Sequence, residues 1–123
     1  MKTIAALNAL RRGQALATSV PSSRPDRLAW IGVYPLDLTR ATTREMLRNH
    51  GQAFPLPSVQ AYRIRRFEVG RALIEIDASI GESELEDKVS LFAFGEADLA
   101  GKLQELGVQI ERLESPHRSN YPI

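Results

Sequence analysis

The stretch from residue 62 to residue 78, YRIRRFEVGRALIEIDA, does most to decide the expected fold. At its centre, Gly70-Arg71 suits a type II′ turn, because the first central position of that turn favours glycine. Folding the chain about this turn sets Phe67 opposite Ile74, and apolar pairs that face each other across two strands stabilise a sheet. The stretch therefore predicts a β-hairpin with a buried face.

The second arm of this hairpin alternates between two sets of side chains, as a strand with one buried face does. The set expected on the buried face is Ala72, Ile74, Ile76 and Ala78. The set expected to face outward is Leu73, Glu75 and Asp77.

The first arm is less regular. Its apolar residues Tyr62 and Ile64 share one phase, and Phe67 falls in the other. An extra residue near Arg65-Arg66 would reconcile the two, so we expect a β-bulge there. The hairpin register also predicts that Arg66 pairs with Glu75.

The remaining elements follow from apolar spacing and from turn residues. We expect helices at residues 3–16, 42–50 and 96–106, strands at 28–34, 88–94 and 108–113, and a loop at 54–57. Thr42 and Glu45 have the spacing of a helix capping box, and Gly51 suits the end of that helix. Because a helix joins strands 88–94 and 108–113, these two are expected to be parallel, with a right-handed crossover.

The expected fold class is α+β, with a single mixed sheet of about five strands, a central hairpin and helices packed on one face. This order partly resembles a ferredoxin-like arrangement with one strand too many. We expect an N-terminal helix within residues 1–17, a Pro- and Ser-rich linker at 18–27 and an α+β region at 28–123. These three segments would form one structural domain overall.

Charge is divided unequally along the chain. Residues 1–72 hold 12 Lys and Arg against 4 Asp and Glu, and residues 73–123 hold 4 against 11, so that balances of +8 and −7 nearly cancel in the net charge of +1. A molecule with this division can present an acidic face to a basic partner.

The acidic half predicts a binding surface for a partner protein. The expected partner-binding residues are Leu73, Glu75, Asp77, Glu82, Glu84, Glu86 and Asp87. The most concrete function for such a surface is that of a bacterial immunity or antitoxin-type inhibitor, which neutralises a toxin such as a nuclease by covering its basic active site. Self-association through the Ala-rich N-terminal helix, giving a homodimer, is a further expectation.

Two other function classes stay open at this stage. One is a small α+β enzyme or small-molecule-binding protein, with acid–base groups drawn from Glu75, Asp77 and His117. The other is RNA or DNA binding, with Arg63, Arg65 and Arg71 on one face and aromatic residues between them. Whether the C-terminal tail at 115–123 is docked or free is also open.

Composition and motifs bear on the chemistry available. The chain has no cysteine, which excludes disulfides, thiolate nucleophiles and cysteine metal sites. With two histidines, at 50 and 117, we expect neither a metal site nor a catalytic set, and no glycine-rich phosphate loop predicts a cofactor. The apolar stretch near the N-terminus is broken at Asn8 and ends at Arg11-Arg12, so we expect a cytoplasmic location without membrane contact.

Overall fold

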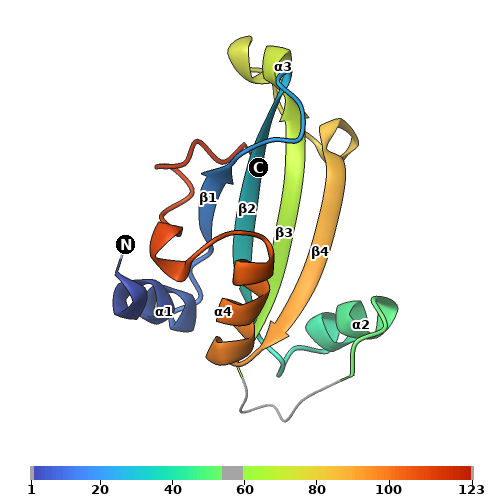
Figure 1. The fold of residues 1–123 in the computed structure, drawn as a ribbon. Helices are drawn as coiled ribbons and strands as arrows, with labels where there is room; N and C mark the ends of the chain where they lie inside the picture. The colour runs from blue at the N-terminus through green and yellow to red at the C-terminus, as the bar shows by residue number, and fades with distance from the viewer. Residues whose placement is uncertain (1, 54–59, 123) are drawn as a thin grey trace.

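The described part of the molecule is built on an antiparallel β-sheet. The computed structural model describes residues 2–53 and 60–122, so the loop expected at 54–57 lies outside the described residues. Within the described ranges, one sheet of four strands has the order β1-β2-β3-β4 (Figure 1). The strands are β1 Leu16–Val20, β2 Arg27–Leu36, β3 Ala61–Gly70 and β4 Glu86–Phe94. The fold is therefore α+β as expected, but the sheet is wholly antiparallel and has four strands instead of about five.

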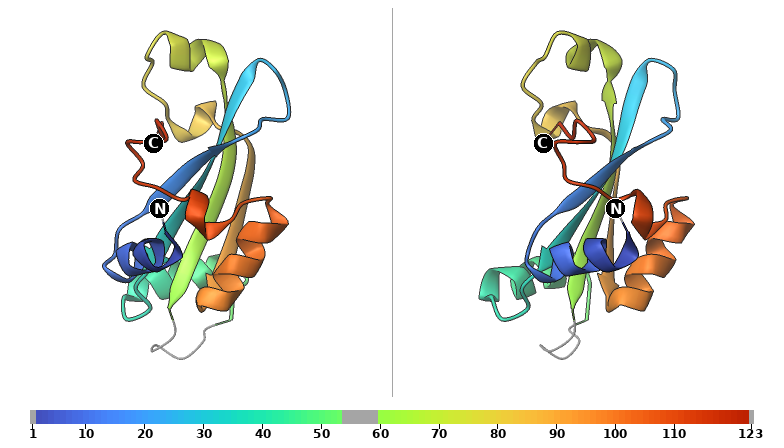
Figure 2. Two further views of the ribbon diagram at one scale, coloured as in Figure 1. Left: turned by 60° about the vertical axis from the view of Figure 1, so that its left-hand side comes forward. Right: turned by 90° about the vertical axis from the view of Figure 1, so that its left-hand side faces the viewer.

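The helices lie on both faces of this sheet, and not on one as expected. The α-helices are α1 Thr3–Arg11, α2 Ala41–Asn49, α3 Arg71–Glu75 and α4 Glu96–Glu105, and the 3₁₀ turns are η1 Glu82–Glu84 and η2 Ile110–Arg112. We call the side covered by α1 and α4 the front face, and α2 lies on the opposite side, the back face (Figures 1 and 2). The two faces are distinct because successive strand residues point to opposite sides.

The front face holds the largest apolar cluster. Its sheet residues include Ile31, Val33, Tyr62 and Ile64, and α1 and α4 contribute Ala6, Ala9, Leu10, Leu99 and Leu103. The Ala-rich side of α1, which we expected to be available for self-association, thus packs against the sheet of its own chain. By contrast, Ile4 on the same helix is 74% exposed.

The back face is covered in two places. At one end, α2 packs Leu47 against Ala61 and Phe92. At the other end, Trp30 and Phe67 pack together with apolar residues of α3 and of the C-terminal tail. Because both faces of β3 are buried, Phe67 belongs to one core and Ile64 to the other, so no bulge at Arg65-Arg66 is needed to explain their phases.

The register irregularity lies in β4 instead. Arg66 is opposite Val89, but Glu68 is opposite Glu86, so two steps along β3 match three along β4. Asp87, within the longer segment, has a φ of 49°, and aspartate is among the residues that tolerate this left-handed conformation. The bulge therefore lies near the start of β4 and includes Asp87.

The expected hairpin at Gly70-Arg71 is wrong. β3 already pairs with β2 on one side and with β4 on the other, so neither edge of β3 is free for a strand at 72–78. The chain instead enters the short helix α3 directly after Gly70, and Arg66 and Glu75 do not pair across strands. Ala, Leu and Glu at 72–75 are strong helix formers, which agrees with this outcome.

Two further expectations about strands are corrected. The expected N-terminal helix stops at Arg11, and part of the expected linker forms β1, which buries Leu16, Ala17 and Thr18 before Pro21. The expected parallel strand at 108–113 is instead the 3₁₀ turn η2, whose Ile110 packs on the front core. Beyond η2, Glu114 forms an isolated antiparallel bridge with Ala17, so that among the described residues β4 has no parallel neighbour and no crossover forms.

The described part of the C-terminal tail is docked on the back face. Its anchor is Tyr121, which contacts Phe67 with ring centroids 5.4 Å apart and whose hydroxyl hydrogen-bonds that of Tyr34. Gly32 makes room for this ring, because a Cβ at position 32 would lie 2.3 Å from the Tyr121 hydroxyl. The indole Nε1 of Trp30 donates to the Ser119 carbonyl at 2.8 Å, which fixes the tail beside the ring.

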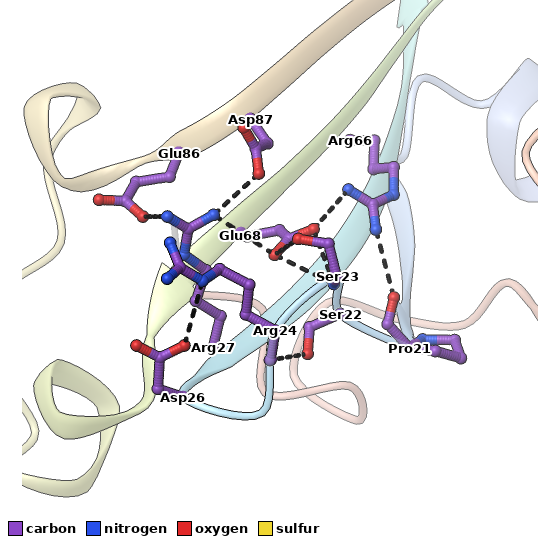
Figure 3. A network of polar contacts seen from close by, with 10 residues as sticks. All are labelled: Pro21, Ser22, Ser23, Arg24, Asp26, Arg27, Arg66, Glu68, Glu86 and Asp87. Carbon is purple, nitrogen blue, oxygen red and sulfur yellow. Dashed lines mark hydrogen bonds and ion pairs between the residues drawn. The ribbon is translucent and has the colours of Figure 1, made fainter.

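A buried carboxylate joins the β1–β2 connection to the sheet (Figure 3). Glu68 is 0% exposed and accepts hydrogen bonds from the backbone N–H and the hydroxyl of Ser23, the latter at 2.8 Å. Nη1 of Arg66 donates to the same carboxylate at 3.0 Å, and Nη1 of Arg27 lies 3.8 Å away. Burial alone would raise the pKa of Glu68, but the hydrogen bonds from Ser23 and Arg66 outweigh it and hold the pKa below its ordinary value.

Arg27 extends this network to the start of β4. Its guanidinium lies 2.8 Å from the Asp87 carboxylate and also pairs with Glu86 (Figure 3). One cation therefore serves three carboxylates, those of Glu68, Glu86 and Asp87. This arrangement ties the β1–β2 connection, β3 and the first residues of β4 together.

Candidate functional site

The strongest candidate for a binding surface is the end of α3. Ile76 is 72% exposed there, and its neighbours Glu75 and Asp77 are also exposed. We call these three residues the acidic tip. Neither carboxylate of the tip has an ion-pair or side-chain hydrogen-bond partner within residues 2–53 and 60–122. An exposed isoleucine between two uncompensated carboxylates is a surface that a partner can bury.

Local backbone structure holds the tip in this form. After α3, the N–H of Asp77 donates to the Ile74 carbonyl at 3.0 Å, and the N–H of Ala78 donates to the Leu73 carbonyl at 3.0 Å. Asp77 has a φ of 54°, so it occupies the left-handed position of a Schellman motif. Leu73 and Ile74 pack against the buried cluster of Trp30, Phe67, Val69 and Leu85, and Ile76 is left exposed.

The structure brings only part of the expected partner-binding set into this surface. Leu73, expected to face outward, packs on the back core, and Ile76, expected to be buried, is exposed. Both expectations fail because helical geometry replaces the two-residue alternation of a strand. Ala72, Leu73 and Glu75 are residue types that favour a helix. This preference was the signal in the sequence from which an exposed Ile76 could have been predicted.

The other expected acidic residues have partners in the chain. Glu86 and Asp87 pair with Arg27, and Glu82 pairs with Arg65 and Lys88. Glu84 accepts hydrogen bonds from the Gly81 N–H at 2.9 Å and the Ser83 hydroxyl at 3.0 Å, and these bonds lower its pKa. Three of these carboxylates, those of Glu82, Glu86 and Asp87, are therefore paired with cations, whereas the two carboxylates of the acidic tip are not.

A second candidate surface is a groove on the back face, which we call the sheet groove. It has a volume of about 490 Å³, and its lining residues are Tyr34, Leu36, Met46, Arg63, Arg65 and Glu82. Two of the three arginines expected to bind nucleic acid, Arg63 and Arg65, therefore lie together. The third, Arg71, lies in α3, where its side chain donates to the Pro25 carbonyl at 3.3 Å.

The two arginines of the sheet groove differ in their partners. Arg65 forms a two-point ion pair with Glu82, with nitrogen–oxygen distances of 2.8 and 3.0 Å, and the hydrogen bond raises its pKa. Arg63 donates from Nε to the Ser90 hydroxyl at 3.0 Å, and its guanidinium carbon lies 5.9 Å from the centre of the Phe92 ring. Among the described residues no carboxylate lies within ion-pair distance of Arg63.

A third hollow lies between α3 and the tail. Its volume is about 540 Å³, and Asp77 and His117 both line it beside Ile74, Ile80 and Pro116. Two of the three expected acid–base residues thus share one hollow, and Glu75 does not line it.

His50 and Ser119 have structural contacts. The His50 ring packs on Phe92 at 5.2 Å between centres, and the buried Ser119 hydroxyl donates to the Pro116 carbonyl at 3.2 Å. In the part of the chain that the structure describes, no group of three or more His, Asp or Glu side chains is placed to hold a metal ion. Nor does any described helix have the length and apolar character needed to cross a membrane.

Comparison with known proteins adds no assignment to this geometry. No protein-family model, curated protein or solved structure matches the chain.

Proposed function

We propose that this protein acts by binding a partner protein through the acidic tip. The observation that carries the proposal is the exposed side chain of Ile76 between two carboxylates that have no partner within the described residues. Apolar burial supplies affinity, and the flanking charges supply orientation and a preference for a basic surface. The tip lies at one end of the sheet, beyond the strands, where a partner can reach it (Figure 1).

The most concrete form of the proposal is an immunity or antitoxin-type inhibitor. A toxin that acts on nucleic acid needs a basic cleft to hold phosphates. A narrow tip with an apolar residue flanked by Glu75 and Asp77 is complementary to such a cleft in charge. The inhibitor would then act by occupying the cleft, without chemistry of its own.

Affinity capture from the native host tests the proposal. The bait is the wild-type chain beside a Glu75→Gln/Asp77→Asn variant, in which asparagine keeps the left-handed backbone at position 77. We expect wild type to retain one stoichiometric protein with a basic surface, and the variant to retain at least tenfold less.

The matched control is Glu45→Gln/Glu105→Gln, which removes two exposed carboxylates far from the tip along the chain. We expect this control to capture the partner as wild type does. Equal capture by the tip variant would show that the tip carboxylates do not contribute to binding. An equal loss with the control would show that net charge, and not the tip, governs binding.

Small-molecule chemistry in the hollow between α3 and the tail is the second candidate function. It is favoured by the presence of a carboxylate, Asp77, and an imidazole, His117, in one hollow. His117→Asn tests it separately, because position 117 lies outside the acidic tip. Loss of small-molecule binding in this variant with unchanged partner capture would support the second candidate and not the first.

A further inference from the structure

The guanidinium of Arg63 lies in the sheet groove and has no ion-pair partner among the described residues, because the one carboxylate in the groove lining, Glu82, pairs with Arg65. Its Nε is engaged by Ser90, so Nη1 and Nη2 remain as the donor pair directed away from that contact. Desolvation and the neighbouring Arg65 cation lower the pKa of Arg63, and the charge of Glu82 opposes them only in part. A partly desolvated cation of this kind gains from an anion placed beside it.

The surroundings of Arg63 define the rest of the ligand. Tyr34, Leu36 and Met46 supply apolar and aromatic surface in the same groove, and the Phe92 ring lies beneath the guanidinium. The volume of about 490 Å³ is within the range of pockets that take small molecules. Arg65 adds no free charge, because Glu82 neutralises it through two contacts.

We propose that the sheet groove binds a small molecule in which one carboxylate or phosphate is attached to a flat apolar body. The anion would be held by the two terminal nitrogens of Arg63, and the body would lie against Tyr34 and Met46. A nucleic-acid strand fits less well, since tracking a phosphate backbone requires a row of uncompensated cations. This site is separate from the acidic tip, so it stands or falls independently of the proposed function.

Methionine NMR gives a direct test, because Met46 lines the groove. Methyl-labelled protein is titrated with benzoate, phenyl phosphate, phenol and inorganic phosphate. We expect benzoate or phenyl phosphate to move the Met46 signal saturably. The tighter of these two probes names the headgroup, and phenol and inorganic phosphate should each bind at least tenfold more weakly.

Variants at position 63 test whether the shift of the Met46 signal depends on Arg63. Arg63→Gln should weaken binding of the tighter probe at least tenfold, and Arg63→Lys severalfold, because lysine keeps the charge but loses the two-point geometry. Arg40→Gln, which removes an arginine that is exposed and does not line the groove, should bind as wild type does. Both groove variants are checked for an unchanged methyl spectrum without ligand.

Three results would overturn the proposal. They are an unmoved Met46 signal with both aromatic anions, equal affinity in folded Arg63→Gln or Arg63→Lys, and equal affinity for inorganic phosphate alone. The last result would show that the groove binds the anion alone and that the apolar body of the ligand contributes nothing to affinity.

Discussion

Glu68 is the residue on which the most polar contacts of the described chain converge. Its carboxylate is fully buried, and it receives hydrogen bonds from Ser23 and Arg66 and the charge of Arg27. A buried carboxylate is stable only when its charge and its lone pairs are satisfied together. This residue therefore couples the β1–β2 connection to the sheet, and through Arg27 to the bulged start of β4.

Replacing Glu68 by glutamine removes the charge and keeps the shape. We expect Glu68→Gln to lower the free energy of unfolding by about 2 to 3 kcal/mol, because two arginines then lose their shared counter-ion. Urea denaturation monitored by Trp30 fluorescence measures the change. Glu105→Gln, at an exposed site, should stay within about 0.5 kcal/mol of wild type, and an equal effect of the two substitutions would contradict this role.

The same carboxylate predicts how stability depends on pH. The pKa of Glu68 is lowered in the folded state from its ordinary 4.5, so the folded chain binds fewer protons than the unfolded chain near that pH. Its stabilising contribution is thus complete above pH 4.5 and is lost as the pH falls through the folded pKa. We expect wild type to lose stability more steeply than Glu68→Gln on acidification, and parallel curves would rule this out.

The segment after Gly70 has a sequence pattern that does not distinguish a strand from a helix. Residues 72–78 fit a two-residue alternation, and they also contain good helix formers. A strand at 72–78 could pair with β3 only if one edge of β3 were free. Both edges are occupied, one by β2 and the other by β4. Local pattern carries no information about that occupancy, and so the prediction of a hairpin failed.

Other elements could be predicted because local signals were sufficient. The apolar run at 28–34 lies within β2, the strand expected at 88–94 lies within β4, and the helices expected at 42–50 and 96–106 are α2 and α4 within one or two residues. β1 was missed since its buried Thr18 and exposed Ser19 look like linker residues, and only pairing with β2 and burial identify the strand.

A helix and a strand at 72–78 would bury different side chains, so two substitutions distinguish them. Leu73→Ser should lower the free energy of unfolding by about 1 to 2 kcal/mol, because Leu73 packs against the back-face cluster that contains Trp30 and Phe67. Ile76→Ser should change it by less than about 0.5 kcal/mol, since Ile76 is exposed. Urea denaturation of both variants checks the order, and the reverse order would favour a strand at 72–78.

For the whole molecule, the opposed charges of the two halves are partly matched within the fold. Arg27 and Arg65, from the basic half, neutralise Glu82, Glu86 and Asp87 from the acidic half. Charged groups without an ion-pair partner in the described chain include the two carboxylates of the acidic tip and Arg63 in the sheet groove. Sequence could identify Glu75 and Asp77 as candidates, but only the fold distinguishes them from the paired carboxylates.

Affinity for the captured partner measures whether the proposed binding through the acidic tip depends on Ile76. The chain offers a closely matched control, because Ile4 and Ile76 are 74% and 72% exposed. We predict that Ile76→Ser weakens binding about tenfold or more, as expected for an isoleucine buried on association, and that Ile4→Ser leaves the Kd unchanged. Equal Kd values for wild type and Ile76→Ser would show that Ile76 does not contribute to partner binding.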